Sequence, residues 1–121
     1  MLRVTNVTRG TLLGERVAEA TTFLARLRGL MFREPLAAGE GLVIQPCTGI
    51  HMFFMTCAID AVFLDGDGVV VAVYGEIEPW TVSSIHASAR CVVELPAGVA
   101  ESTGTVVGDR LALEPGVVHG V

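Results

Sequence analysis

The chain has 121 residues, of which 51% are hydrophobic, and this composition excludes an intrinsically disordered protein. No apolar run reaches the roughly 18 residues of a membrane-spanning helix, and the formal net charge of −5 argues against a dedicated nucleic-acid binder. The length suits one hydrophobic core, so we expect a single domain over residues 1–121.

Two short strands are predicted at the N-terminus, Leu2–Val7 and Thr11–Val17. The turn between them, Thr8–Gly10, ends on a glycine, which accommodates a positive φ. Basic and polar side chains interrupt this segment where a signal peptide would have its apolar stretch. We therefore expect the protein to remain in the cytoplasm.

One main helix is predicted, at roughly Thr22–Phe32, with Thr21 or Thr22 as its N-cap. Pro35 disfavours helical backbone at the residue before it, so the helix should end by that point. Apolar side chains recur within the helix at spacings of three and four residues, which is typical of a buried stripe: Leu24, Leu27 and Met31.

The clearest structural signal is a hairpin that joins Ala58–Leu64 to Val69–Tyr74 through the acidic turn Asp65–Gly68. The second apolar run does not alternate with polar residues, which predicts a strand covered on both faces. We expect this hairpin at the centre of the sheet. Before it, strands are predicted at Gly41–Gln45 and at the aromatic-rich Ile50–Phe54.

After the hairpin, the pattern predicts a long surface loop, a strand, one helical turn, a segment with a turn and a closing strand, and a tail. In order, these are Gly75–Ala87, Ala89–Leu95, Val99–Thr103, Val106–Leu113 and Glu114–Val121. The total is about seven or eight short strands and one main helix. We therefore predict a mostly β (α+β) fold, as a small barrel-like or two-layer antiparallel β domain with the helix packed on it.

No metal or cofactor site is predicted. The cysteines form no C-x-x-C pair, and His51 lies near Cys47 and Cys57 without ligand spacing. The acidic turn Asp65–Gly68 lacks the glycine of a calcium loop, because Val70 stands at that position. Phosphate-binding and nucleophile-elbow motifs are absent from the chain.

Asp60 and Glu94 each stand within an otherwise apolar strand, where a buried, unpaired charge would be costly. Each side chain must therefore face solvent, bind a partner or line a cleft. The period of two in a strand places Glu94 on the same face as Val92. We expect an arginine from the helix end, Arg28 or Arg33, to pair with Glu94, because a guanidinium suits a carboxylate.

Several short motifs stand in a fixed order: Arg28–Arg33, Gly41-Leu42, His51–Met55 leading to Ile59–Leu64, Pro79-Trp80, Glu94–Gly98 and Gly108-Asp109. Over about residues 20–113, this order resembles domain-of-unknown-function family 192, also called uncharacterised protein family 0127. The resemblance implies a compact, mostly β, barrel-like single domain found in prokaryotes. It implies no particular activity.

Our leading hypothesis is a small, soluble, non-catalytic domain that binds a small molecule or a protein partner, with neither nucleic acid nor membrane as partner. One alternative is a hydrolase or transferase that uses Asp60 or Glu94 as its general base. Another is a purely structural or interaction module. The candidate cleft near the helix end and the aromatic segment consists of Arg28, Arg33, His51, Asp60, Trp80 and Glu94.

Overall fold

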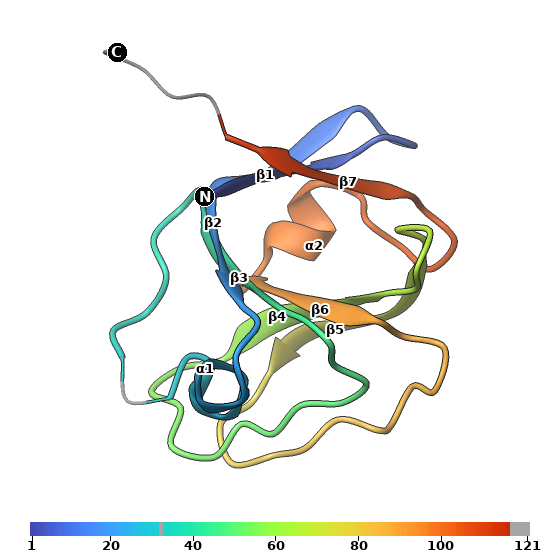
Figure 1. Ribbon diagram of the computed structural model, residues 1–121. Coiled ribbons are helices and arrows are strands. Elements are labelled where there is room, and N and C mark those ends of the chain that lie inside the picture. The colour runs from blue at the N-terminus through green and yellow to red at the C-terminus, as the bar shows by residue number, and fades with distance from the viewer. Residues whose placement is uncertain (32, 117–121) are drawn as a thin grey trace.

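The computed structural model describes residues 1–31 and 33–116, and its strands form one seven-stranded sheet in the order β5-β4-β6-β3-β2-β1-β7. The sheet curves into a half-barrel, with helix α2 inside the curve and helix α1 near the end of β2 (Figure 1). The mostly β prediction is confirmed. The strands are β1 Leu2–Asn6, β2 Thr11–Ala20, β3 Glu40–Ile44, β4 Ile59–Leu64, β5 Val70–Ile77, β6 Cys91–Pro96 and β7 Leu111–Pro115, and the helices are α1 Phe23–Arg28 and α2 Val99–Ser102.

Strands β2 and β3 run parallel, whereas the other neighbouring strands of the sheet are antiparallel. A parallel pair needs a crossover connection, and α1 with its following loop supplies it. The predicted cap is confirmed, because the Thr22 hydroxyl accepts a hydrogen bond from the Ala25 amide at 3.1 Å. The crossover places Gly29, at the end of α1, near both β3 and β6, because a Cβ there would lie 3.5 Å from Ile44 Cδ1 and 3.7 Å from Glu94 Oε1.

Helix α1 is shorter than the predicted Thr22–Phe32. It ends at Gly29, which has a φ of +48° and closes the helix before Pro35 can act. Phe32 and the side chains of Leu24 and Leu27, which belong to the expected apolar stripe, lie outside the described residues.

The sheet separates two apolar clusters. One contains Val93 and Leu95 of β6 and packs against Val99 of α2, whereas the other contains Val92 of β6 and lies on the opposite face. Every residue of β4 and the first five residues of β6 are buried, so these strands are covered on both faces. The sequence predicted a strand covered on both faces at β5 instead. That prediction differs from the structure, because Val71 is only partly buried.

Three further expectations differ from the structure. The predicted central hairpin lies at one end of the sheet, because β5 is the first strand in the order. The predicted strand Ile50–Phe54 is irregular, with one isolated bridge from His51 to Val82 and a positive φ at Phe54. The predicted tail begins too early, because β7 continues to Pro115.

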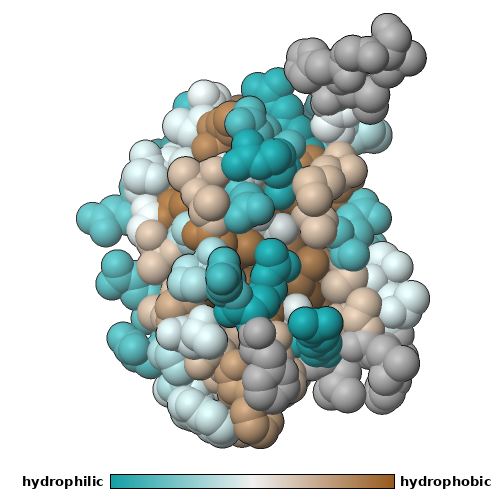
Figure 2. All heavy atoms as spheres, turned by 90° about the vertical axis from the view of Figure 1, so that its left-hand side faces the viewer, coloured by the Kyte–Doolittle hydropathy of each residue, from teal (hydrophilic) through white to brown (hydrophobic). Residues whose placement is uncertain are grey.

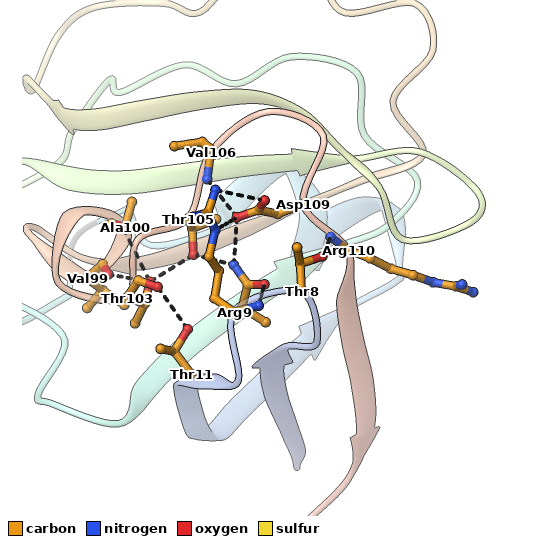
Figure 3. Close-up of polar contacts among 11 residues, drawn as sticks. Thr8, Arg9, Thr11, Val99, Ala100, Thr103, Thr105, Val106, Asp109 and Arg110 are labelled. Carbon is orange, nitrogen blue, oxygen red and sulfur yellow. Dashed lines mark hydrogen bonds and ion pairs between the residues drawn. The ribbon is translucent and has the colours of Figure 1, made fainter.

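A group of polar side chains lies beside α2 (Figure 3). Asp109 accepts hydrogen bonds from Arg9 Nε and from Asn6, each at 3.0 Å, and Asn6 also donates to Thr105 at 3.1 Å. The hydrogen bonds from Arg9 and Asn6 lower the pKa of Asp109 to about 2. Thr103 joins this group through its hydroxyl, 2.8 Å from that of Thr105. The group links the first turn of the chain to the segment before β7.

Candidate functional site

Glu94 lies in the middle of β6, between Leu42 of β3 and Ala61 of β4 in the register of the sheet. Glu94 and Val92 lie on the same face of the sheet, as the two-residue period of a strand predicted. The side chain is buried, with 3% of the residue exposed, and its cross-strand neighbours offer no charge. A carboxylate therefore stands inside an apolar layer.

Among the residues that the structure describes, none donates a hydrogen bond to the Glu94 carboxylate or forms an ion pair with it. The predicted partners, Arg28 and Arg33, both have exposed side chains. The prediction that one of them holds Glu94 is wrong. Burial instead raises the pKa of Glu94 to about 7, because no charge on the described part of the chain compensates for the lost water.

The Glu94 carboxylate faces a cavity of about 60 Å³ between α1, β3 and the segment that follows β3. This volume has room for a small polar group, since one water molecule needs about 10–15 Å³. The absence of a side chain at Gly29 keeps this space open, because a Cβ there would lie 3.7 Å from Glu94 Oε1. The other lining side chains are Arg26, Arg28, Leu30, Met31, Ile44, Cys47, Ile50, His51 and Met55.

Arg26 brings a second unsatisfied charge to the cavity. Its Nη1 donates a hydrogen bond to the Pro46 carbonyl at 3.2 Å, which anchors the guanidinium at the cavity wall. Its Nε is buried and has no hydrogen-bond partner. No ion pair or hydrogen bond joins Arg26 to Glu94, so two opposite charges line one small space without neutralising each other.

Cys47 and His51 contribute the remaining reactive groups. The Cys47 thiol donates to the Gly49 carbonyl at 3.1 Å, and burial raises the pKa of this thiol, so it is not an activated nucleophile. His51 Nδ1 accepts a hydrogen bond from the Phe53 amide at 3.2 Å, and the two rings stack with centroids 5.1 Å apart. These contacts orient the imidazole.

Two wider hollows flank the cavity. An outer groove of about 450 Å³ is lined by Arg26, Ile44, Cys47 and His51, which also line the cavity, and extends it toward Pro46 and Thr48. A second hollow, lined by Glu19, Arg28 and Arg33, lies beside Gly29. Seen from the left of Figure 1, the surface mixes hydrophilic and hydrophobic residues without one dominant apolar patch (Figure 2).

Asp60 does not belong to this site. The register pairs Asp60 with Leu95 and Ala61 with Glu94, so the two acidic side chains lie on opposite faces of the sheet. The Asp60 carboxylate accepts hydrogen bonds from the backbone amides of Glu76, Gly98 and Ala100 at 2.8, 3.1 and 2.8 Å. It holds the start of α2 against β4 and β5.

Trp80 lies at the surface, 60% exposed, and is not part of the cavity wall. Its ring packs on Phe53 and Phe54, with centroids 6.0 and 4.9 Å apart. Of the six predicted cleft residues, Arg28, His51 and Glu94 line one cavity, whereas Arg33 lines the neighbouring hollow. The prediction omitted Arg26 and Cys47, because no spacing in the sequence associates the helix with Glu94 of a distant strand.

Among the described residues, no group of three or more His, Cys, Asp or Glu side chains is arranged to hold a metal ion. The three cysteines, Cys47, Cys57 and Cys91, are free thiols. The absence of a metal or cofactor remains a prediction from the sequence.

Comparisons with known proteins show a family for the chain as a whole. The model of domain-of-unknown-function family 192 (DUF192), described as "Uncharacterized ACR", matches residues 4–113. The UPF0127 protein of Pyrococcus furiosus is 36% identical over 109 residues, which cover 88% of this chain and 93% of that protein. The UPF0127 protein of Thermococcus sibiricus is 33% identical over 113 residues, which cover 90% and 73% respectively.

Two solved structures share the fold. A protein of unknown function from Novosphingobium aromaticivorans has a TM-score of 0.79 and 23% identity, covering 92% of this chain and 82% of that one. A protein from Sinorhizobium meliloti, named a "putative transcription regulator", has a TM-score of 0.78 and 23% identity, covering 93% and 91%. At this identity, the likeness shows the fold alone.

Proposed function

This chain belongs to the DUF192 family, as its motifs predicted, and we propose that it binds a small molecule through Glu94. The observation that supports this proposal is the buried Glu94 carboxylate, which faces a cavity and has no partner among the described residues. The ligand would donate a hydrogen bond or a positive charge to this carboxylate. The family has no assigned activity, so the proposal rests on the site.

The energetics favour a binding role over a structural one. An unpaired buried carboxylate destabilises a fold, whereas an apolar residue at the same position would not. A group that lowers stability and lines a cavity is typical of a functional site. The alternative of a purely structural or interaction module does not explain why a carboxylate is buried without a partner at Glu94.

A small N–H donor tests the proposal. Above about pH 7.5, where Glu94 is largely ionised, methylammonium should raise the thermal unfolding midpoint of the wild-type protein. Tetramethylammonium, which has no N–H group, should not. Glu94→Gln should abolish the difference between the two salts. Equal effects of both salts on the wild type, or an unchanged difference in Glu94→Gln, would contradict the proposal.

A second function is supported by the pKa of Glu94, about 7, which suits a general base at neutral pH. The protein would then be a hydrolase or transferase, with Glu94 in that role and not Asp60, whose carboxylate already accepts three backbone N–H groups. This function predicts hydrolysis of p-nitrophenyl acetate with a rate that rises through about pH 7. Loss of that hydrolysis in Glu94→Gln would distinguish it from binding alone.

Other features of the proposal follow from the sequence. We infer that the chain forms a single domain that remains in the cytoplasm and that its partner is not a nucleic acid, as the net charge of −5 supports. Within residues 1–31 and 33–116, no helix is long and apolar enough to cross a membrane.

A further inference from the structure

The cavity presents charges of both signs. Glu94 and Arg26 line it together, and neither charge neutralises the other. Burial is the main cause of the raised pKa of Cys47, and the charges of Glu94 and Arg26 shift that pKa in opposite directions. Both charged groups therefore lie near one thiol. A ligand that satisfies the cavity needs a donor for the carboxylate and an acceptor for the guanidinium.

We propose that the ligand is a free α-amino acid, whose ammonium group binds Glu94 and whose carboxylate binds Arg26. The inference rests on the proposed function of the Glu94 cavity and adds the class of ligand. In a free α-amino acid, the two charged groups are separated by one carbon atom, so both fit a small space. A peptide carries only one of them at each end.

Ligands with a single charge fit less well. A simple cation would leave Arg26 Nε unsatisfied and would share the cavity with its positive charge. A simple anion would face the Glu94 carboxylate. The zwitterion compensates both groups and brings no net charge into an apolar layer.

The outer groove defines where the side chain of the amino acid lies. The cavity of about 60 Å³ accommodates the ammonium and carboxylate groups, and the groove of about 450 Å³ continues from it past Ile44 and Cys47 to Pro46. These neighbours are largely apolar. An amino acid with an apolar side chain, such as L-leucine, should therefore bind more tightly than glycine.

Calorimetric titration above about pH 7.5 tests the inference. The probes are L-leucine, glycine, methylammonium and acetate. L-leucine should bind at least about tenfold more tightly than methylammonium or acetate, as expected for two charged hydrogen bonds against one. Glu94→Gln and Arg26→Gln should each weaken L-leucine binding by about tenfold or more. The control Arg110→Gln, an exposed arginine outside the cavity, should bind as the wild type does.

A thermal melt of each variant confirms that it folds, and Arg26→Lys provides a second variant that keeps the charge but loses the planar donor group. Its affinity should lie between those of the wild type and Arg26→Gln. If methylammonium binds as tightly as L-leucine and Arg26→Gln has no effect, the amino-acid inference is overturned while binding at Glu94 stands. If no probe binds, both the inference and the proposed function are overturned.

The pH dependence provides an independent check. The ligand ammonium requires an ionised Glu94, and the groups that face this carboxylate across the cavity are Arg26, Arg28, Cys47 and His51. Affinity for L-leucine should rise between about pH 6 and pH 8 as Glu94 loses its proton. An affinity that is constant over this range, or that falls, would overturn the inference.

Discussion

At the scale of single residues, Glu94 lines the candidate site but lowers the stability of the fold, because its carboxylate is buried without a partner among the described residues. The register places it between Leu42 and Ala61, where a sheet would normally have an apolar side chain. Asp60, one strand away, is equally buried, but three backbone amides compensate its carboxylate. The two acids thus have opposite roles: Asp60 organises the fold and Glu94 is available to a ligand.

The raised pKa of Glu94 predicts how stability depends on pH. The folded protein holds this proton to about pH 7, whereas the pKa of an ordinary glutamate is 4.5. Protonated Glu94 is favoured in the folded state, so its contribution to stability is complete below about pH 4.5 and is lost as the pH rises through about 7. The loss is about 3 kcal/mol for a shift of this size.

Glu94→Gln should therefore gain stability relative to the wild type as the pH rises. Urea unfolding at about pH 5 and about pH 8 measures the free-energy difference between the two proteins, and we expect it to shift toward the variant by about 2–3 kcal/mol. Glu34→Gln, at an exposed position, serves as the control with no pH-dependent difference. The same difference at both pH values for Glu94→Gln would show that the carboxylate is not desolvated.

Part of this site could be predicted from the sequence. The alternation of β6 is a local property, so the sequence predicted that Glu94 shares a face of the sheet with Val92, and left open whether that face is buried. The identity of its surroundings is a tertiary property. Helix α1 ends early at Gly29, Arg28 and Arg33 are exposed, and Arg26, one turn before Gly29, contributes a guanidinium whose Nε is buried. Neither residue spacing nor charge in the sequence indicates which arginine lines the cavity with Glu94.

At the scale of elements, β4 and β6 are buried along nearly their whole length, whereas β5 lies at the end of the sheet order and is only partly buried at Val71 and Val73. The run of valines in β5 predicted a strand covered on both faces, because a continuous apolar run is typical of such a strand. The aromatic residues Phe53 and Phe54 likewise suggested a strand, but they pack on Trp80 from an irregular segment. Long-range contacts overrode local preference in both segments.

The burial of these strands predicts different costs for the same substitution. Val62 in β4 is 0% exposed and Val71 in β5 is only partly buried. Val62→Asp introduces an unpaired charge into the core and should abolish cooperative folding, whereas Val71→Asp should remain folded with a lowered melting temperature. Thermal unfolding followed by circular dichroism compares the two. A cooperative transition of Val62→Asp near that of the wild type would contradict the two-sided burial of β4.

At the scale of the whole molecule, the two ends of the sheet meet, although β5 and β7 stand at opposite ends of the strand order. Leu111 donates a backbone hydrogen bond to Gly68 at 2.8 Å, and Val70 donates one to Asp109 at the same distance. The side chains of Asp109 and Arg9 add their ion pair at this junction (Figure 3). The half-barrel is therefore closed by a few backbone contacts at the hairpin turn.

Gly68 is the residue on which this closure depends, and Gly66 in the same turn provides a matched comparison. Gly68 has a φ of +81°, and a Cβ at this position would lie 2.6 Å from the Leu111 carbonyl oxygen, closer than real Cβ contacts allow. At Gly66, the nearest atom to an added Cβ is Arg90 Cγ, at 3.8 Å, which is an ordinary contact.

Gly68→Ala should therefore separate the two ends of the sheet, and Gly66→Ala should not. We expect Gly68→Ala to lower the free energy of unfolding by at least about 2 kcal/mol, from the strained φ and the lost contacts to β7, and Gly66→Ala to change it by less than about 0.5 kcal/mol. Amide hydrogen exchange locates the effect, because the Leu111 amide should lose protection in Gly68→Ala while the amides of β4 and β6 retain theirs. If both variants unfold alike and Leu111 remains protected, the hairpin turn does not close the half-barrel.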